Sequence, residues 1–355
     1  MVRPPKILVM GAGLIGLSTA DSLQRRGANV TVTDARSGAM HGTSYSNSGM
    51  IHPSQSRPWI SSGDESFDLE ATKTVLRLAK DSQTLLLERF QSLGLGEALT
   101  RPAGCYQIFE NSREAQAAQD FYLSVGLQAD LVSDAVKTLG HLALHFPQDR
   151  SGDAYQYGQA LKARLSENGA VFIYKASDLK LRQGRDGITA QLRGHIFDCD
   201  HVVVCAGPQS AEVLAQMGIS LPLTSSRGFA VNFDRPNIEL SEQPIMDAES
   251  RSAMTVLGQT LRFSGTLGEA SAQPLLKRWF HLAPDIMSGL SPAREVWSGL
   301  RPIPPRGRPY ISATSIPNLW VNTGHGHMGW TLCTGSGELM SEMILGEKED
   351  TRFTL

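Results

Sequence analysis

The sequence predicts an α/β fold in which a Rossmann-type, dinucleotide-binding domain is interrupted by an α+β domain with an antiparallel sheet. Three observations predict it: a strand, glycine-rich turn and helix at the start of the chain, a second such junction near its end, and alternating strand patterns between them. The 355 residues are enough for about two domains. Lys and Arg number 33 against 35 Asp and Glu, so we expect no basic surface for nucleic acid.

Cysteine usage and hydropathy exclude several further classes. The four cysteines form no C-x-x-C pair and no zinc-finger spacing with histidine, so we expect neither a disulfide framework nor a metal site. No run of apolar residues approaches the ~18 that a membrane span requires. Glycines interrupt the apolar run at the N-terminus, which is typical of a βα turn and not of a secretory signal peptide. We therefore expect a cytoplasmic protein, and peripheral attachment to the inner face of a membrane stays open.

The N-terminal motif has the order that dinucleotide binding requires, namely a strand, G-x-G-x-x-G and a helix. Lys6 to Met10 reads as a buried strand, and a helical pattern ending near Arg26 follows the glycines. Gly11 allows the tight turn, Gly13 lets the backbone approach a pyrophosphate, and Gly16 lets the helix pack closely on the strand. Free N–H groups and the positive end of the helix dipole then face the phosphates.

A second apolar strand, Asn29 to Thr33, ends in Asp34. A carboxylate at this place accepts hydrogen bonds from ribose hydroxyls, and it favours an unphosphorylated ribose such as that of NAD or FAD. The motif alone does not separate these two cofactors.

The middle of the chain alternates between parallel and antiparallel patterns. We expect helices over residues 64–92 and from an Asp153 cap to Asn168-Gly169, and strands over Val171–Tyr174, His201–Cys205, 226–234, 253–257 and 261–266. The sequence thus predicts a discontinuous nucleotide domain of residues 1–50, 145–220 and 301–355, interrupted by a substrate domain of residues 51–144 and 221–300.

The C-terminal third contains two further signals. Arg301 lies between a glycine and a proline-rich bend, which would hold its guanidinium in a fixed orientation suited to bidentate binding of a carboxylate. The alternative interpretation is that Arg301 forms a salt bridge that anchors the loop. Leu319–Thr323 reads as a strand, and a glycine-rich loop leads from it into a helical run that begins at Thr331. The N–H groups of such a junction can stabilise a flavin that becomes anionic on reduction.

Together these motifs resemble the small-subunit family of FAD-dependent D-amino-acid dehydrogenases, within the flavoenzymes that oxidise glycine, sarcosine and D-amino acids. The matching segments are GAGLIGLSTA at 11–20, TSYSNSGMIHP at 43–53, GCYQIFE at 104–110, VVVCAGPQS at 202–210, LRFSGTLGE at 261–269, WSGLRPIPPRGRPYI at 297–311 and LWVNTGHGHMGWTLCTGSGEL at 319–339. They follow the family order over nearly the whole chain.

The resemblance implies FAD as the cofactor and assigns site residues; we expect the flavin to be bound non-covalently because no attachment motif stands out in the sequence. The cofactor-binding candidates are Gly11, Gly13, Leu14, Ile15, Gly16, Asp34, Ala35, Ser44, Asn47, Ser48, Gly49, Ala206, Gly207, Gly324, His325, Gly326, His327, Met328, Gly329 and Trp330. Arg301 matches the arginine that pairs with the substrate carboxylate, and Arg227 is a second candidate for that role. His52 is a candidate proton acceptor, with a structural histidine as the alternative. No catalytic base and no metal ligand is assigned with certainty.

The chain also departs from the family pattern. Asp34 stands where such proteins more often have Glu, and His327-Met328 replaces a smaller hydroxyl residue and Leu. The chain is shorter than typical dehydrogenase subunits. These departures leave substrate choice and membrane association open.

The resemblance implies oxidative deamination of a D-amino acid, in which hydride passes to flavin N5 and the imine is hydrolysed to a 2-oxo acid and ammonia. The electrons then pass to a quinone or another acceptor. One alternative is an oxidase of glycine, sarcosine or a cyclic imino acid that uses dioxygen. Another is an FAD subunit of a heteromeric dehydrogenase that is active only with partner chains. The C-terminal junction argues against an NAD-dependent dehydrogenase.

Overall fold

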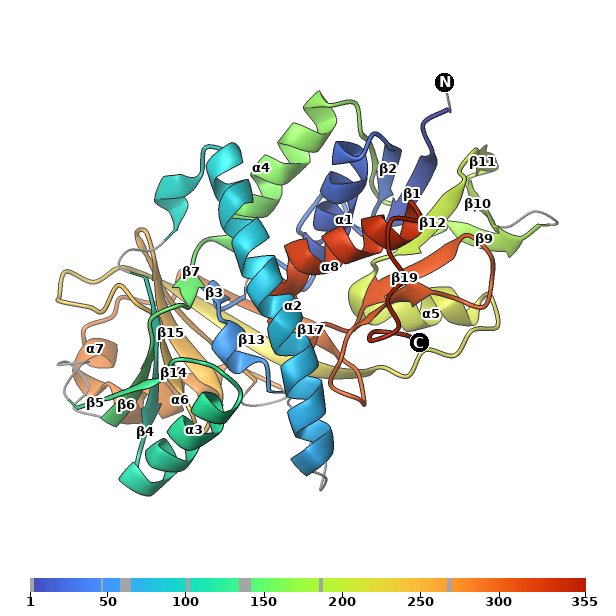
Figure 1. The fold of residues 1–355 in the computed structure, drawn as a ribbon. Helices are drawn as coiled ribbons and strands as arrows, with labels where there is room; N and C mark the ends of the chain where they lie inside the picture. Colours follow the sequence, from blue (N-terminus) through green and yellow to red (C-terminus); the bar gives the residue numbers. More distant parts are fainter. Residues whose placement is uncertain are drawn as a thin grey trace.

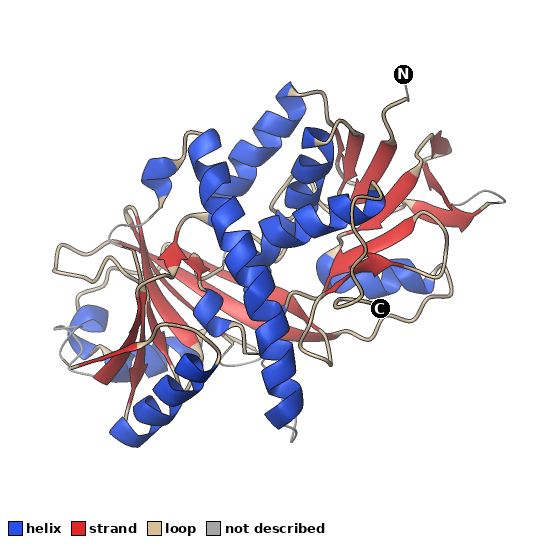
Figure 2. Ribbon diagram, viewed as in Figure 1, coloured by secondary structure: helices blue, strands red, loops and turns tan. Residues whose placement is uncertain are grey.

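The computed structural model describes residues 3–45, 47–57, 65–99, 103–133, 142–184, 188–266 and 270–355. Two sheets lie beside each other, and a long helix, α2 (Glu65–Ser92), runs between them (Figures 1 and 2). Ser46 of the matching segment 43–53, residues 267–269 of segment 261–269 and the first residue of the helix expected over 64–92 lie outside the described residues.

The first sheet is the predicted nucleotide-binding sheet. In the described chain it contains six strands in the order β18-β19-β12-β1-β2-β8. Their bounds are β1 Lys6–Met10, β2 Asn29–Thr33, β8 Val171–Ile173, β12 His201–Val204, β18 Tyr310–Ala313 and β19 Leu319–Thr323. All neighbours are parallel except β18 and β19, and β1 and β12 are apolar on both faces because helices and a second core cover them.

Three helices cover one face of this sheet: α1 (Leu14–Arg25), α4 (Ala154–Glu167) and α8 (Gly329–Ile344). Helices α1 and α8 touch backbone to backbone, because a Cβ atom on Gly337 would lie 2.6 Å from the carbonyl carbon of Ser18. The Asn322 side chain at the end of β19 donates a hydrogen bond of 3.0 Å to Thr19 Oγ1 on α1. These contacts fix both helix N-termini relative to the carboxyl ends of the strands.

The second sheet contains eight described strands in the order β17-β13-β16-β15-β14-β4-β6-β5. Their bounds are β4 Cys105–Phe109, β5 Asp130–Val132, β6 Leu142–Phe146, β13 Thr224–Asp234, β14 Ile245–Asp247, β15 Ser252–Leu257, β16 Thr260–Gly265 and β17 Glu295–Ile303. It is antiparallel apart from the β14–β4 pair. Helix α6 (Gln273–Leu282) closes its core, in which Phe263 and Trp279 lie with ring centroids 5.4 Å apart.

Smaller elements complete the fold. They are α3 (Ser112–Ser124), α5 (Ser210–Ala215), α7 (Pro284–Ser288), the ribbon β9 (Lys180–Gln183), β10 (Ile188–Leu192) and β11 (His195–Phe197), the pair β3 (Met50–Ile51) and β7 (Arg150–Ser151), and the 3₁₀ turns η1 (Pro53–Gln55), η2 (Gly96–Ala98), η3 (Gly207–Gln209) and η4 (Gly326–Met328).

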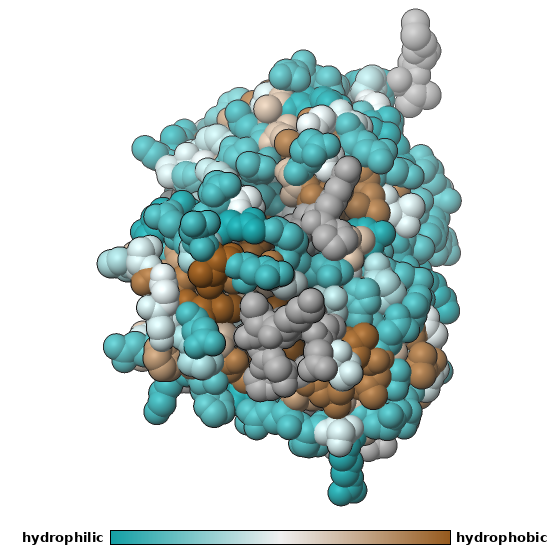
Figure 3. All heavy atoms as spheres, turned by 90° about the vertical axis from the view of Figure 1, so that its left-hand side faces the viewer, coloured by the Kyte–Doolittle hydropathy of each residue, from teal (hydrophilic) through white to brown (hydrophobic). Residues whose placement is uncertain are grey.

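At the end of the molecule formed by the second sheet, hydrophilic side chains surround several apolar areas (Figure 3).

Helix α2 contacts both halves of the molecule. Leu78 and Leu86 belong to the core cluster that includes α1 and α8, and Ser82 Oγ accepts a hydrogen bond of 2.9 Å from Gly335 N on α8. Leu76 instead packs with the cluster of α3 and β6. The sequence places residues 51–144 wholly in the substrate domain, and the packing of α2 on α8 shows that this helix is shared; the domain limits themselves stay a prediction.

The structure confirms the fold class and the placement of most expected elements. The strands at 6–10, 29–33 and 319–323 have the predicted bounds, and the Asp153 carboxylate caps α4 by accepting from Tyr155 N and Gln156 N. The helix expected from Thr331 starts earlier, at Gly329, because the loop before it already turns as a 3₁₀ helix. In the described part of the chain, no helix is long and apolar enough to cross a membrane.

Candidate active site

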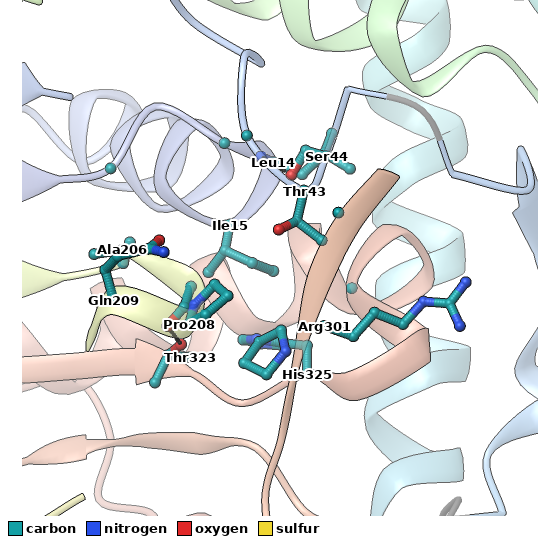
Figure 4. Close-up of a pocket in the computed structure, with 18 of the residues that line it drawn as sticks. Leu14, Ile15, Thr43, Ser44, Ala206, Pro208, Gln209, Arg301, Thr323 and His325 are labelled. Atoms are coloured by element: carbon teal, nitrogen blue, oxygen red, sulfur yellow. Dashed lines mark hydrogen bonds between the residues drawn. The ribbon is translucent and has the colours of Figure 1, made fainter. Parts of the chain in front are cut away.

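A cavity of about 450 Å³ opens at the carboxyl ends of β1, β2, β12 and β19 and extends to the edge of the second sheet. This is the place where open parallel sheets bind ligands. In Figure 4, Leu14, Ile15 and Ser44 lie on one side of it, Ala206, Pro208, Gln209 and Thr323 on another, and Arg301 at the opposite end from Gln209.

The glycines of the first turn are needed for backbone packing as well as for ligand approach. Gly11 has φ +118°, and a Cβ atom there would lie 2.3 Å from the Cys205 carbonyl oxygen. A Cβ atom on Gly16 would lie 1.8 Å from the Gly11 carbonyl oxygen. Gly13 differs, because its Cβ would meet only the Ser44 side chain, with Oγ at 3.0 Å. Gly13 is therefore the position at which a side chain would enter the cavity without breaking the fold.

Asp34 is fixed by the backbone around it. Its Oδ2 accepts from Ala12 N at 2.8 Å, and its Oδ1 accepts from Arg36 N at 2.8 Å. The carboxylate thus ties the end of β2 to the glycine turn and faces the cavity, where it is placed for ribose hydroxyls.

Two helix N-termini open into the same cavity. Leu14 and Ile15 begin α1, Gly329 and Trp330 begin α8, and all four line the cavity. Neither N-cap residue caps its helix with its own side chain, and neither first turn holds an acidic residue, although Ser44 Oγ accepts from Leu14 N at 3.1 Å at the start of α1. A dinucleotide with an anionic pyrophosphate fits the first N-terminus, and a flavin edge that gains negative charge fits the second. The donor set therefore fits FAD.

The glycine loop before α8 carries a buried histidine, His325, and a half-buried one, His327, and both are uncharged at neutral pH. Burial lowers the pKa of His325 to about 3, and burial, His52 and two arginines hold the pKa of His327 well below its usual range. His327 Nε2 lies 2.8 Å from the Gln55 carbonyl oxygen, so the imidazole donates there. The loop is thereby held against η1 with no positive charge of its own.

His52 does not line the cavity, although the sequence singles it out as a candidate proton acceptor. Its ring stacks on that of His327 with centroids 6.4 Å apart, and its backbone N–H donates to Thr331 Oγ1 at 3.1 Å. Burial, opposed by a backbone hydrogen bond and aided by the Arg301 charge, lowers its pKa to about 4. These observations favour the alternative of a structural histidine.

Arg301 lines the cavity from β17, near the edge of the second sheet. Burial lowers the pKa of its guanidinium to about 10, so the group stays charged at neutral pH. It packs over Gly228 of β13, where a Cβ atom would lie 3.1 Å from Arg301 Cζ. A half-buried arginine on the wall of a cavity suits a carboxylate ligand. Arg227, by contrast, is exposed, donates to Ser298 Oγ at 3.3 Å and lies outside the cavity lining.

Replacing Gly228 by alanine is expected to raise KM for carboxylate substrates several-fold, because the new methyl group pushes the Arg301 guanidinium from its position. Steady-state kinetics and FAD content of the purified variant measure this. Gly289→Ala is a control for glycine loss in the same half of the molecule, since Gly289 has φ −90° and a Cβ atom there would meet only carbonyl oxygens at 3.7 Å. An unchanged KM in Gly228→Ala would show that the guanidinium position does not matter.

The structure brings most of the sequence-predicted residues to one cavity. Those in its lining are Gly11, Gly13, Leu14, Ile15, Asp34, Ala35, Ser44, Asn47, Ser48, Ala206, Gly207, Arg301, His325, Gly326, His327, Gly329 and Trp330. Gly324 and Met328 line a small neighbouring cavity instead, together with parts of the same loop. Gly16 and Gly49 do not line either cavity; each packs against neighbouring backbone and side-chain atoms.

Several lining residues were missed by sequence reasoning. They are Met10, Thr33, Arg36, Gly42, Thr43, Met50, Ala176, Ser177, Leu179, Cys205, Pro208, Gln209, Glu212, Val213, Gln216, Gly228, Phe229, Ser264, Trp297, Gly299, Pro302, Asn322 and Thr323. Those at 176–179 and 205–209 directly follow β8 and β12, so the rule that ligands bind beyond the carboxyl ends of parallel strands would have found them. Those of the second sheet carry no such signal.

A buried carboxyl group supports the segment beside the histidines. Asp149 is 2% exposed; its Oδ2 accepts from Ser54 Oγ at 2.5 Å, and its Oδ1 accepts from Ser54 N at 3.3 Å. Ser54 belongs to η1, the turn whose Gln55 carbonyl oxygen accepts from His327. Burial raises the pKa of Asp149 to about 7 although the Ser54 hydrogen bonds lower it. The acid therefore titrates near neutral pH.

Wild-type protein is expected to lose stability relative to Asp149→Asn as pH rises. The folded pKa of about 7 exceeds the unfolded value of 3.8, so the unfolded chain releases this proton first and the loss accrues between about pH 4 and pH 7. The total loss is a few kcal/mol, because a difference of one in pKa between the folded and unfolded states corresponds to about 1.4 kcal/mol. Denaturant unfolding at pH 5 and pH 8 measures it, with exposed Asp234→Asn as control. The same pH dependence of the unfolding free energy in all three proteins would contradict a raised pKa of Asp149.

Comparison with known proteins agrees with this geometry. A family model described as FAD dependent oxidoreductase, DAO, matches residues 6–343. The chain is similar to a D-amino acid dehydrogenase of Vibrio vulnificus (strain YJ016), with 28% identity over 99% of this chain and 98% of the relative. It is also similar to a D-amino acid dehydrogenase of Rhizobium rhizogenes, with 28% identity over 97% of each chain.

Solved structures share the fold at lower identity. A glycine oxidase from Bacillus cereus has a TM-score of 0.80 and 19% identity, covering 97% of this chain and 96% of that one. Among the described residues no group of His, Cys, Asp and Glu could hold a metal ion. The match over residues 6–343 and the two helix N-termini that open into one cavity lead to the same conclusion: the chain belongs to the DAO family of FAD-dependent oxidoreductases.

Proposed function

We propose that the protein oxidises a D-amino acid to its 2-oxo acid and ammonia, and passes the electrons to a quinone or another acceptor in the cytoplasm. The observation that carries this proposal is the half-buried, charged Arg301 on the wall of the cavity that fits FAD. The choice of the D-enantiomer is supported by the curated relatives, which are D-amino acid dehydrogenases over nearly the full length of the chain.

In the proposed mechanism the protein positions the substrate and controls its charge. The Arg301 guanidinium binds the carboxylate in a bidentate way, which directs the Cα–H bond toward the cofactor. Bound FAD would supply the redox chemistry, as the site of hydride acceptance. The Arg301 charge disfavours a second positive charge nearby, which favours the neutral form of the substrate amine.

No side chain of the described residues needs to act as a base in this scheme. His325 and His327 line the cavity but are uncharged, and their lowered pKa values make them weak proton acceptors. The N-terminus of α8 stabilises negative charge that develops at its end of the cavity. Orientation by Arg301 together with this dipole is the protein's contribution to the barrier, of which orientation alone can supply roughly 7–11 kcal/mol.

Steady-state assays with an artificial dye acceptor test the substrate and the acceptor together. We expect turnover with several D-amino acids, none with their L-enantiomers, and little peroxide in air, because the proposal assigns the electrons to an acceptor other than dioxygen. Peroxide release with glycine, sarcosine or proline would favour an oxidase. A flavin that turns over none of these amines alone would favour a subunit that requires partner chains.

A further inference from the structure

Three polar side chains form a row across the second sheet. Asn232 of β13 stands directly opposite Arg262 of β16 on one side and opposite Glu295 of β17 on the other. Directly opposed residues of neighbouring strands share a face and contact each other. Asn232 Nδ2 donates to Glu295 Oε2 at 2.8 Å, and Arg262 Nε donates to Asn232 Oδ1 at 2.7 Å.

Both ends of this row hold the loop that precedes β3. At one end, Arg262 Nη1 donates to the Asn47 carbonyl oxygen at 2.8 Å. At the other end, Tyr45 Oη donates to Glu295 Oε1 at 2.8 Å. The loop is thus anchored on the sheet at two positions close together in the sequence.

The anchored loop forms part of the cavity wall, whereas Arg262 lies behind it. Asn47 and Ser48 line the cavity, as does Ser44, while Arg262 does not. The Asn47 side chain accepts from Gly49 N at 2.8 Å, and Gly49 has φ +75°, so the loop turns sharply right after the residue that Arg262 holds. A shift of the Asn47 carbonyl would therefore move the wall of the cavity.

Burying the Arg262 guanidinium costs free energy, so we expect this polar row to have a role other than stabilising the fold. Arg262 is 9% exposed, and burial lowers its pKa while the nearby carboxylates of Asp153 and Glu295 raise it. An apolar row of the same volume would be about as stable, and a buried ionic row is retained where it specifies a geometry. Here the geometry it specifies is that of the loop from Ser44 to Gly49.

We propose that Arg262 is a positioning residue for FAD: through the row of Arg262, Asn232 and Glu295 it fixes the Asn47 carbonyl and the loop that borders the cofactor. The proposal rests on FAD binding by the family, and not on which amino acid is oxidised. Its test can therefore fail or succeed independently of the D-amino-acid proposal.

Replacing Arg262 by methionine removes both hydrogen bonds but keeps much of the side-chain volume. We expect the dissociation constant of FAD, measured on flavin-depleted protein by fluorescence quenching, to rise about 10- to 100-fold, as for the loss of hydrogen bonds from a charged group. We also expect the visible absorbance maxima of bound flavin and its midpoint potential to shift, because the cavity wall has moved.

Arg278→Met is the matched control, since it removes a largely buried, ion-paired arginine from the same half of the molecule. Arg278 of α6 contacts Asp247 at 2.7 Å and Glu110 at 2.7 Å, and it does not line the cavity. This control should lower Tm while the FAD dissociation constant, spectrum and potential stay at wild-type values. A lowered Tm with unchanged FAD binding in this control would distinguish a positioning role of Arg262 from a general effect of lost stability.

Arg262→Lys provides a milder second variant if the methionine variant does not fold. Lysine keeps the charge but lacks the planar fork that reaches Asn47 and Asn232 at once, so an intermediate dissociation constant is expected. Wild-type FAD affinity, spectrum and potential in every Arg262 variant that folds would overturn the proposal, whatever happens to Tm.

Discussion

Replacing Arg301 by lysine is expected to raise KM for carboxylate substrates about 10- to 100-fold, because lysine cannot offer the two parallel N–H donors of a guanidinium. FAD content should stay at the wild-type level, since the arginine lies at the end of the cavity away from the glycine turn and from Gln209. Steady-state kinetics on holoenzyme with matched flavin content measure the effect.

Arg227→Lys is the matched control for this prediction. Arg227 pairs with Leu300 in the register of β13 and β17, so it is a close neighbour of Arg301, but its side chain is exposed. Its replacement should leave KM unchanged. A rise in KM for Arg227→Lys together with no rise for Arg301→Lys would exchange the roles of the two arginines.

Replacing Gly13 by alanine is expected to abolish FAD binding at micromolar FAD concentrations and to leave a folded apoprotein. The backbone of Gly13 has φ −81°, which alanine adopts without strain, and its Cβ would meet only the Ser44 side chain. The methyl group would instead occupy the place where a pyrophosphate approaches the start of α1. Absorbance at purification and thermal unfolding of flavin-free protein report the two effects separately.

Gly16→Ala supplies the contrast. Its Cβ would lie 1.8 Å from the Gly11 carbonyl oxygen, so this variant should lose soluble folded protein rather than the cofactor alone. Full flavin loading of Gly13→Ala would contradict the placement of the pyrophosphate at this helix N-terminus.

The N-terminal nucleotide-binding elements were predictable because their signals are local. A buried strand, a glycine turn with fixed spacing and an acid after the next strand follow each other in the sequence, and the structure places Gly13 and Asp34 in one cavity. The loop from Gly324 to Gly329 was found in the same way, from a strand followed by glycines and a helix. Residue spacing is sufficient in such cases because the backbone itself forms the site.

The substrate-domain wall was not predictable in this way. Phe229, Ser264 and Trp297 reach the cavity through the register of β13, β16 and β17, and the pairing of these strands depends on contacts between distant parts of the chain. The sharing of α2 between two cores likewise depends on which residues face each neighbour. Arg262 shows no motif at all, and its role follows only from hydrogen bonds to Asn232 and Asn47.

An anaerobic visible spectrum of the holoenzyme, before and after single amino acids are added, tests the central claim most directly. We expect particular D-amino acids to bleach the flavin band, whereas their L-enantiomers, glycine, sarcosine and proline should not. The Arg301→Lys protein should need more substrate for the same bleaching. Flavin that stays oxidised with every D-amino acid, or that is bleached by the other amines alone, would contradict the proposed oxidation of D-amino acids.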